Sequence, residues 1–195
     1  MVVGITGGIG SGKSTIVNMF SKFENIAIYI ADEEAKKLMN TSSIIKESLI
    51  KEFGTDTYKN NQLNRPYLAN IVFNNKNKLA ILNSIVHPEV HKHLENFIKS
   101  NSFKDYILYE NAILFENGSN KICDKIITVT APLETKINRV IKRDNTTRDE
   151  VISRMKNQWS DQKKSLQSHY LIVNTSLQKT QTQVLKIHNS LTKKK

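Results

Sequence analysis

The sequence predicts an α/β fold in three layers, a P-loop fold with helices on both faces of a parallel five-stranded sheet. Strand-like apolar runs alternate with helix-like runs along the 195 residues, as they do in proteins built from strand–helix–strand units. The strand-like runs are continuously apolar, which is typical of strands buried on both faces. The first run leads directly into a glycine-rich segment that matches G-x-x-x-x-G-K-[ST], the P-loop pattern that binds phosphate.

The P-loop pattern spans residues 7–14, directly after the first expected strand at residues 2–6. Its glycines allow positive φ angles, which bring successive backbone N–H groups close to phosphate oxygens. Lys13 is expected to reach the β- and γ-phosphates of a nucleoside triphosphate, and the Ser14 hydroxyl to bind Mg²⁺. A glycine turn without a ligand is the alternative, and the strand before the loop and the helix expected after it disfavour that reading. The residues expected to contact the nucleotide here are Gly8, Ile9, Gly10, Ser11, Gly12, Lys13, Ser14 and Thr15.

Four further strands are expected at residues 26–30, 106–109, 126–130 and 170–173. Residues 32–100 are too many for a single crossover helix, and their apolar spacing predicts a helical insert at the C-terminal edge of the sheet. Pro88 predicts a kink or a new helix start inside this insert. A second insert, the lid, is expected at residues 139–165. The chain is therefore predicted to be one domain, with a core made of residues 1–31, 101–138 and 166–195.

The lid region is expected to be helical and is rich in arginine. Pro132 is expected just inside one helix, and Thr147 with Glu150 forms a capping box that starts another. Arginines on a flap that closes over a nucleotide neutralise the transferring phosphoryl group, while closure excludes water. The alternative is a solvated face with salt bridges to Asp144, Asp149 or Glu150. The arginines in question are Arg139, Arg143, Arg148 and Arg154.

Asp32 comes two residues after the second expected strand, so we expect it at the C-terminal edge of the sheet. A carboxylate there can accept a proton from an attacking hydroxyl or hold a water on Mg²⁺. The alternative is an ordinary N-cap for a helix over residues 33–39. Three histidines, His87, His91 and His93, raise the possibility of a metal site, but the residues around them do not complete one.

The net charge of +11 suits nucleic acid, an anionic membrane or small polyphosphorylated ligands as partners. Part of it lies in residues 193–195, which we expect to form a frayed tail. No nucleic-acid-binding pattern, signal peptide or transmembrane run is evident, so neither nucleic acid nor a membrane is expected as a partner. The single cysteine, Cys123, excludes an internal disulfide and suits a cytoplasmic location.

Taken together, these residues resemble the dephospho-CoA kinase family, from Ile5 to about Asn174. The P-loop with T-G-G-I-G-S-G-K-S is narrower than the general pattern, and the other matching segments stand at the spacing found in the family. These segments are Ala31-Asp32 with Ala35; Leu63-Asn64-Arg65 with Leu68 and Phe73; His87-Pro88; Ile113-Leu114-Phe115-Glu116; Arg143-Asp144, Thr147-Arg148, Arg154 and Gln158; and Ile172-Val173-Asn174.

The resemblance implies a kinase of the nucleoside-monophosphate-kinase type that transfers the γ-phosphoryl group of ATP to the 3′-hydroxyl of dephospho-CoA, with Mg²⁺. It implies that Asp32 is the general base, that Lys13 and Arg143 assist catalysis, and that Arg139, Arg143 and Arg148 belong to the lid over ATP. It places acceptor binding in the insert and at one position beyond it. The implied acceptor-binding residues are Asp32, Lys36, Arg65, His87, Pro88 and Glu116. A monomer or weak homo-oligomer is expected.

Four positions depart from the family pattern: Ile30 replaces an acid, Lys36 an arginine, Ala112 a proline and Glu110 an aspartate. They bear on the geometry of Mg²⁺ and of acceptor binding, and leave the P-loop and the base in place. The nearest rival function is a kinase of the same fold acting on a nucleotide or sugar acid. A GTP-driven switch is disfavoured because residues 75–78 read N-K-N-K and not N-K-x-D. An ATPase on nucleic acid predicts steeply salt-dependent binding.

Overall fold

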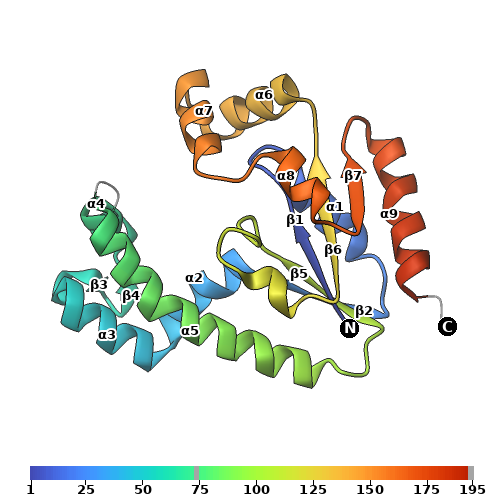
Figure 1. Cartoon of the computed structure of the whole chain (residues 1–195). Coiled ribbons are helices and arrows are strands. Elements are labelled where there is room, and N and C mark those ends of the chain that lie inside the picture. Colours follow the sequence, from blue (N-terminus) through green and yellow to red (C-terminus); the bar gives the residue numbers. More distant parts are fainter. Residues whose placement is uncertain (73–74, 193–195) are drawn as a thin grey trace. The chain divides into compact units, whose positions relative to one another are not determined.

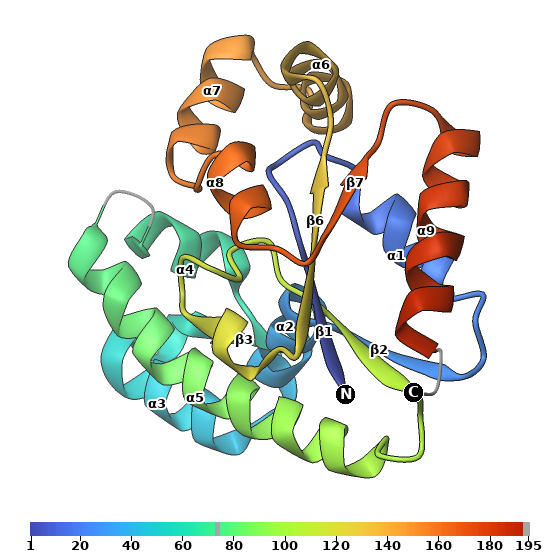
Figure 2. The same ribbon diagram turned by 45° about the vertical axis from the view of Figure 1, so that its right-hand side comes forward.

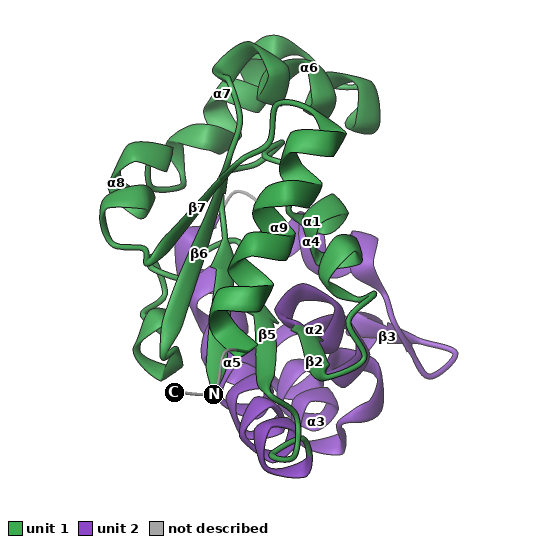
Figure 3. Ribbon diagram, turned by 90° about the vertical axis from the view of Figure 1, so that its right-hand side faces the viewer, with its two compact units in different colours: residues 1–29, 101–195 green, residues 30–100 purple. Residues whose placement is uncertain are grey.

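The computed structural model describes residues 1–72 and 75–192 (Figure 1), so Phe73 of the family pattern and the expected tail at residues 193–195 lie outside the described residues. The chain forms two compact units. The core unit comprises Met1–Tyr29 and Asn101–Lys195, and the insert unit comprises Ile30–Ser100 (Figure 3).

The core unit is built on the predicted five-stranded sheet, whose strand order is β2-β5-β1-β6-β7. The central strand β1 pairs in parallel with β5 and β6, and β6 pairs in parallel with β7. Each strand begins and ends within one residue of its expected position, which confirms the fold class. The strands are β1 (Val2–Thr6), β2 (Ile26–Ile30), β5 (Tyr106–Glu110), β6 (Lys125–Thr130) and β7 (Tyr170–Val173).

Helices flank this sheet. The P-loop helix α1 (Lys13–Phe20) packs beside the C-terminal helix α9 (Leu177–Thr192), as Figure 2 shows. The short helix α8 (Asp161–Leu166) packs against β6. A single 3₁₀ turn, η2 (Ser119–Ile122), follows β5. Continuous burial of β1 and β5 explains why both read as uninterrupted apolar runs.

The lid region contains α6 (Leu133–Asp144) and α7 (Arg148–Lys156). The predicted capping box is confirmed: the Thr147 side chain accepts from the Glu150 N–H while the Glu150 side chain accepts from the Thr147 N–H. Pro132 is the N-cap of α6 and not a residue inside the helix, because its ψ of 142° is extended. The two helices enclose a small hydrophobic cluster, the α6–α7 cluster, formed by Ile137, Val140 and Val151 with Ile9, Ile141, Ile152 and Met155 packed against it.

His188 fixes α9 against the rest of the core unit. Its ring stacks on Phe23 with centroids 3.7 Å apart, and its Nδ1 lies 2.9 Å from the buried Tyr106 hydroxyl. Burial lowers the pKa of His188, partly offset by the negative charge of Asp105. The neutral ring is therefore the form that the folded protein favours.

We expect the free energy of unfolding to fall as the pH falls below the ordinary histidine value of 6.5. In that range the unfolded chain gains a proton at position 188 while the folded chain resists it, so protonation favours unfolding. Urea unfolding at pH 7.5 and 5.5 measures the loss, and His188→Phe, which keeps a ring over Phe23, should shrink it. An equal pH dependence in that variant would assign the loss to other groups.

At Val173, the outer edge of the sheet is bonded by a side chain. Gln183 on α9 accepts a hydrogen bond from the Val173 N–H and donates one to the Val173 carbonyl, at 3.0 and 3.2 Å. Val173 lies on β7, the last strand in the sheet. Both backbone groups of Val173 that point away from β6 are therefore bonded within the chain.

The insert unit is mostly helical, as predicted. Its buried core contains Ile45, Leu49, Phe53, Leu68 and Val86. The helices are α2 (Ala31–Thr41), α3 (Ser43–Phe53), α4 (Arg65–Val72) and α5 (Lys76–Ser100), and a 3₁₀ turn, η1 (Thr55–Thr57), follows α3. Pro88 lies inside α5, so the expectation of a new helix start was wrong.

A small antiparallel hairpin in the insert unit was not predicted. It consists of β3 (Tyr58–Lys59) and β4 (Gln62–Leu63), joined by two asparagines at positive φ. Asn60 and Asn61 adopt φ angles of 50° and 67°, a conformation that asparagine tolerates better than most residues. The Asn-Asn pair is the sequence signal for this turn.

Candidate active site

The P-loop has the backbone geometry that its glycines predict. Gly10 and Gly12 adopt φ angles of 78° and 90°, in the left-handed region that favours glycine. Gly12 is the N-cap of α1 and provides no side-chain hydrogen bond, so the N–H groups of the first turn are left for another acceptor. Lys13 Nζ donates to the Gly7 carbonyl at 2.7 Å, which places the amine over the start of the loop. Ser14 and Thr15 are exposed.

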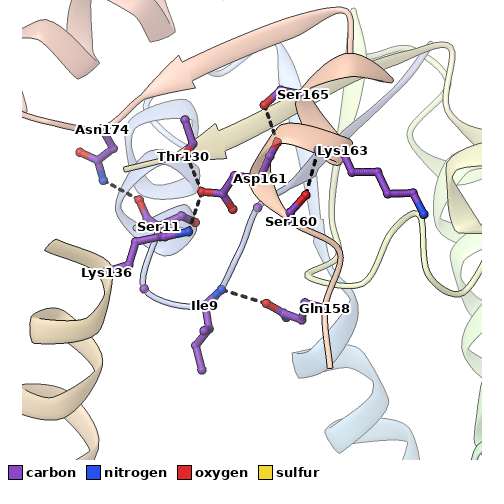
Figure 4. A network of polar contacts seen from close by, with 12 residues as sticks. Ile9, Ser11, Thr130, Lys136, Gln158, Ser160, Asp161, Lys163, Ser165 and Asn174 are labelled. Atoms are coloured by element: carbon purple, nitrogen blue, oxygen red, sulfur yellow. Dashed lines mark hydrogen bonds and ion pairs between the residues drawn. The ribbon is translucent and has the colours of Figure 1, made fainter. Parts of the chain in front are cut away.

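Side chains from the second half of the core unit hold the loop from outside (Figure 4). The buried Asn174 donates through Nδ2 to the Ser11 carbonyl at 2.9 Å. Arg139 donates through Nη1 to the carbonyls of Gly10 and Ser11, each at 3.4 Å. A Cβ added to Gly12 would lie 2.2 Å from Asn174 Nδ2, so the packing as well as the φ angle requires glycine there. Of the predicted lid arginines, Arg139 contacts the loop in this structure.

A second support was missed at the sequence level. Lys136 Nζ on α6 lies 2.6 Å from Asp161 Oδ2 on α8, and the Thr130 hydroxyl donates to the same oxygen at 2.5 Å (Figure 4). Both charged side chains are largely buried, with 10% and 19% of their surface exposed. Asp161 Oδ1 lies 2.7 Å from the position a Cβ of Gly8 would occupy, which puts this ion pair against the loop. The partners are 25 residues apart, and no local pattern links them.

The other lid arginines pair with carboxylates. Arg143 Nε lies 2.7 Å from Asp144, and Arg154 lies 2.9 Å from the same side chain. Arg148 makes two bonds of 2.7 Å to Glu134. These pairs are partly or largely exposed, so each contributes little to stability. These three arginines therefore fit the alternative of a solvated face with salt bridges. Of the three carboxylates expected as partners, Asp144 pairs with Arg143 and Arg154, while Arg148 pairs with Glu134.

Glu116 anchors the segment before α8. Its Oε1 accepts from the Trp159 N–H at 2.8 Å and lies 2.9 Å from Nζ of the fully buried Lys164. Burial opposes the charged form, but the bonds from Lys164 and Trp159 prevail and hold the pKa of Glu116 below its ordinary value. The Trp159 ring stacks on Phe115 at a centroid distance of 5.6 Å, and Lys163 Nζ lies 3.5 Å from the centre of the Trp159 ring. A role of Glu116 in acceptor binding stays a prediction.

A cavity of about 460 Å³ opens beside the loop, between the lid helices and α8. Leu133, Ile152, Met155 and Trp159 supply its apolar wall. Polar groups enter it from the loop and from its supports. The polar or loop residues that line it are Gly8, Lys136, Lys156, Gln158, Ser160 and Asp161.

The remaining predicted residues lie on the insert unit, and all are exposed. Asp32 and Lys36 are four residues apart on α2 and so share one face of that helix. Asp32 is in the first turn, and Ile30 is the N-cap, so the N-cap alternative for Asp32 was wrong. Arg65 begins α4 and borders a groove of about 580 Å³ with Asn40, Gln62 and Leu63. His87 and Pro88 lie in the middle of α5 and not at a helix junction.

Within residues 1–72 and 75–192, no three His, Cys, Asp or Glu side chains are grouped as a metal site would need. None of the helices in these ranges has the length and apolar content needed to cross a bilayer.

Comparison with known proteins identifies the family to which this chain is similar. The family model described as dephospho-CoA kinase matches residues 1–179. A dephospho-CoA kinase of Bacteroides fragilis is 33% identical over 185 residues, covering 95% of this chain and 90% of the relative. One from Fusobacterium nucleatum is 36% identical over 177 residues, covering 90% of each.

Solved structures agree on the fold. The Thermus thermophilus protein TT1252 superposes with a TM-score of 0.85 at 28% identity, covering 97% of this chain and 96% of that one. Dephospho-CoA kinase from Campylobacter jejuni gives a TM-score of 0.67 at 24% identity, covering 99% of this chain and 98% of that one. The family match spans residues 1–179, which include the P-loop and the lid region, and the Bacteroides and Fusobacterium relatives are 33% and 36% identical over at least 90% of the chain. The chain therefore belongs to the dephospho-CoA kinase family.

Proposed function

We propose that this chain transfers the γ-phosphoryl group of ATP to the 3′-hydroxyl of the dephospho-CoA ribose, giving CoA and ADP. The observation that carries the proposal is a P-loop with an uncapped helix start, braced by an arginine of the lid region, in a chain matched to the dephospho-CoA kinase family over residues 1–179. Phosphoryl transfer depends mainly on positioning and charge stabilisation, and this arrangement supports both.

In this proposal the N–H groups between Gly8 and Thr15 surround the phosphates, apart from that of Ile9, which donates to Gln158. Lys13 exchanges the Gly7 carbonyl for β- and γ-phosphate oxygens, which are stronger acceptors because they are charged. The exposed Ser14 hydroxyl would help to hold Mg²⁺, since hard oxygen donors suit this ion. Mg²⁺ supplies neutralisation of the triphosphate charge.

Asp32 is assigned the role of general base toward the acceptor hydroxyl. It stands at the start of α2, directly after β2, and its exposed carboxylate is available to a ligand. Arg143 and Arg148 are assigned to the transferring phosphate. To bind it, they would break their ion pairs with Asp144 and Glu134. Exposed ion pairs are weak, so this exchange costs little.

The acceptor is assigned to residues of the insert unit and to Glu116. Lys36, Arg65 and His87 offer positive or hydrogen-bonding groups to a bulky phosphorylated acceptor, and Pro88 shapes the surface beside His87. We place the enzyme in the cytoplasm as a monomer or weak homo-oligomer, with no nucleic-acid or membrane partner.

The test is ADP release from Mg·ATP with and without dephospho-CoA, with the product mass checked for one added phosphate. The proposal expects turnover that depends strongly on the acceptor and yields CoA. If the protein bound ATP but phosphorylated a nucleotide or a sugar acid and not dephospho-CoA, it would be the rival kinase of the same fold. ATP hydrolysis stimulated by DNA or RNA would overturn the kinase assignment.

A further inference from the structure

Ile9 is the non-glycine residue of the segment from Gly7 to Gly10, and two contacts within the core unit hold it in place. Its side chain packs against the α6–α7 cluster of Ile137, Val140 and Val151. Its backbone N–H donates to Oε1 of Gln158 at 3.0 Å (Figure 4). Glycines have the widest conformational freedom of any residue, so a loop of this composition needs outside contacts to keep one shape.

Gln158 is well placed to provide such a contact. It follows α7 by two residues, and its N–H donates to the Met155 carbonyl at 3.1 Å, which ties it to the last turn of that helix. The next residue, Trp159, is fixed by its N–H bond to Glu116. The Gln158 side chain therefore extends from a segment that is anchored on both sides, and it joins the end of the lid helix to the loop.

We propose that Gln158 is a positioning residue that makes the geometry of the phosphate loop depend on the lid. When the lid is in place, the Gln158 oxygen and the α6–α7 cluster together fix the rotation of the peptide at Ile9. The loop segment from Gly7 to Gly10, over which Lys13 Nζ is held by the Gly7 carbonyl, then has one conformation. Movement of α7 would be passed to this segment through the side chain and the N–H of Ile9.

The proposal rests on the kinase activity and predicts how catalysis and binding separate. Gln158 is bonded to the Ile9 N–H, whereas the N–H groups at the start of α1 belong to other residues and Lys13 Nζ donates to the Gly7 carbonyl, so we expect most phosphate contacts to survive removal of the Gln158 side chain. What is lost is the alignment of the loop beside the transferring group. Small misplacements of reacting groups lower rates by up to about 10²-fold, so we expect kcat to change far more than ATP affinity.

The test compares Gln158→Met, which keeps the side-chain length but has no strong acceptor, with Gln158→Glu, which keeps an oxygen for the Ile9 N–H. Gln158→Met is expected to lower kcat by about tenfold or more while the Kd for ATP stays within about threefold. Gln158→Glu is expected to recover kcat but to weaken ATP binding, because it adds negative charge near the phosphates. Gln162→Met, at an exposed position on α8, is the matched control and should behave like the unmodified enzyme.

Unchanged kcat in Gln158→Met would overturn the proposal. Equal losses of kcat and ATP affinity in Gln158→Met would also overturn it, if Gln158→Glu did not recover kcat. Hydrogen exchange at the Ile9 amide of the unmodified protein provides a readout that depends on neither folding of a variant nor activity. The proposal expects protection there; exchange at the rate of an unstructured peptide would reject it. Inactive wild-type enzyme with a protected Ile9 amide would instead count against the proposed reaction.

Discussion

Replacing Lys13 with methionine is expected to lower kcat by roughly 10²–10³-fold, the effect of removing one preorganised charge-stabilising donor from an active site. Methionine keeps an unbranched stem but cannot donate to phosphate oxygens or to the Gly7 carbonyl that Lys13 contacts at 2.7 Å. ATP affinity should fall as well, since the amine is assigned to both the β- and γ-phosphates. Steady-state kinetics with dephospho-CoA and calorimetric titration with Mg·ATP measure the two effects.

The matched control is Lys22→Met, which removes an exposed lysine just beyond the same helix and should leave both quantities unchanged. Similar losses in the two variants would indicate a general effect of net charge on an anionic substrate. Normal kinetics in Lys13→Met would show that the loop does not bind the transferring phosphate.

Asp32→Asn is expected to lower kcat by about 10²–10⁴-fold, the range attributed to general acid–base catalysis, while ATP affinity changes little. Asparagine has nearly the same shape, so the first turn of α2 should persist, but its amide cannot take a proton from the acceptor hydroxyl. Single-turnover phosphoryl transfer reports the chemical step, and equilibrium titration reports ATP binding.

Glu33→Gln is the control, because Glu33 is the neighbouring exposed carboxylate in the same turn and is assigned no role. If Asp32→Asn weakened ATP binding as much as turnover, Asp32 would belong to the binding of Mg·ATP. If the variant kept full activity, the base would have to be sought elsewhere.

The sheet could be predicted closely because each strand is an apolar run, and in β1, β5 and most of β6 this run is buried along its length. The start of α7 was also predictable, since a capping box is a local pattern of four residues. The hairpin of the insert unit was not, because each of its strands is two residues long and carries no alternation. Continuous helix through Pro88 reflects tertiary packing that outweighs the local cost of proline.

In the site, local chemistry was predictable and long-range pairing was not. The P-loop is a contiguous motif, whereas Lys136 and Asp161 come from different helices and lie 25 residues apart in the sequence. Helices carrying the arginines of the lid region were predicted, but sequence alone could not show that Arg139 contacts the loop while Arg143 and Arg148 pair with carboxylates. Gln158 was part of the family pattern, but its partner could not be predicted. That partner is the backbone N–H of Ile9, and almost every residue has such a group whatever its side chain.

The bonding of Val173 by Gln183 has a consequence for self-association. An outer strand with unpaired backbone groups is a template on which another chain can add a strand, and such addition leads toward aggregation. The outward side chains of β7 include Leu171 and Val173, 45% and 39% exposed, which would favour that addition. The amide of Gln183 presents one donor and one acceptor in the manner of a neighbouring peptide. At Val173 the Gln183 amide thus occupies the backbone groups that an added strand would need, and strand addition at this end of β7 would first have to displace it.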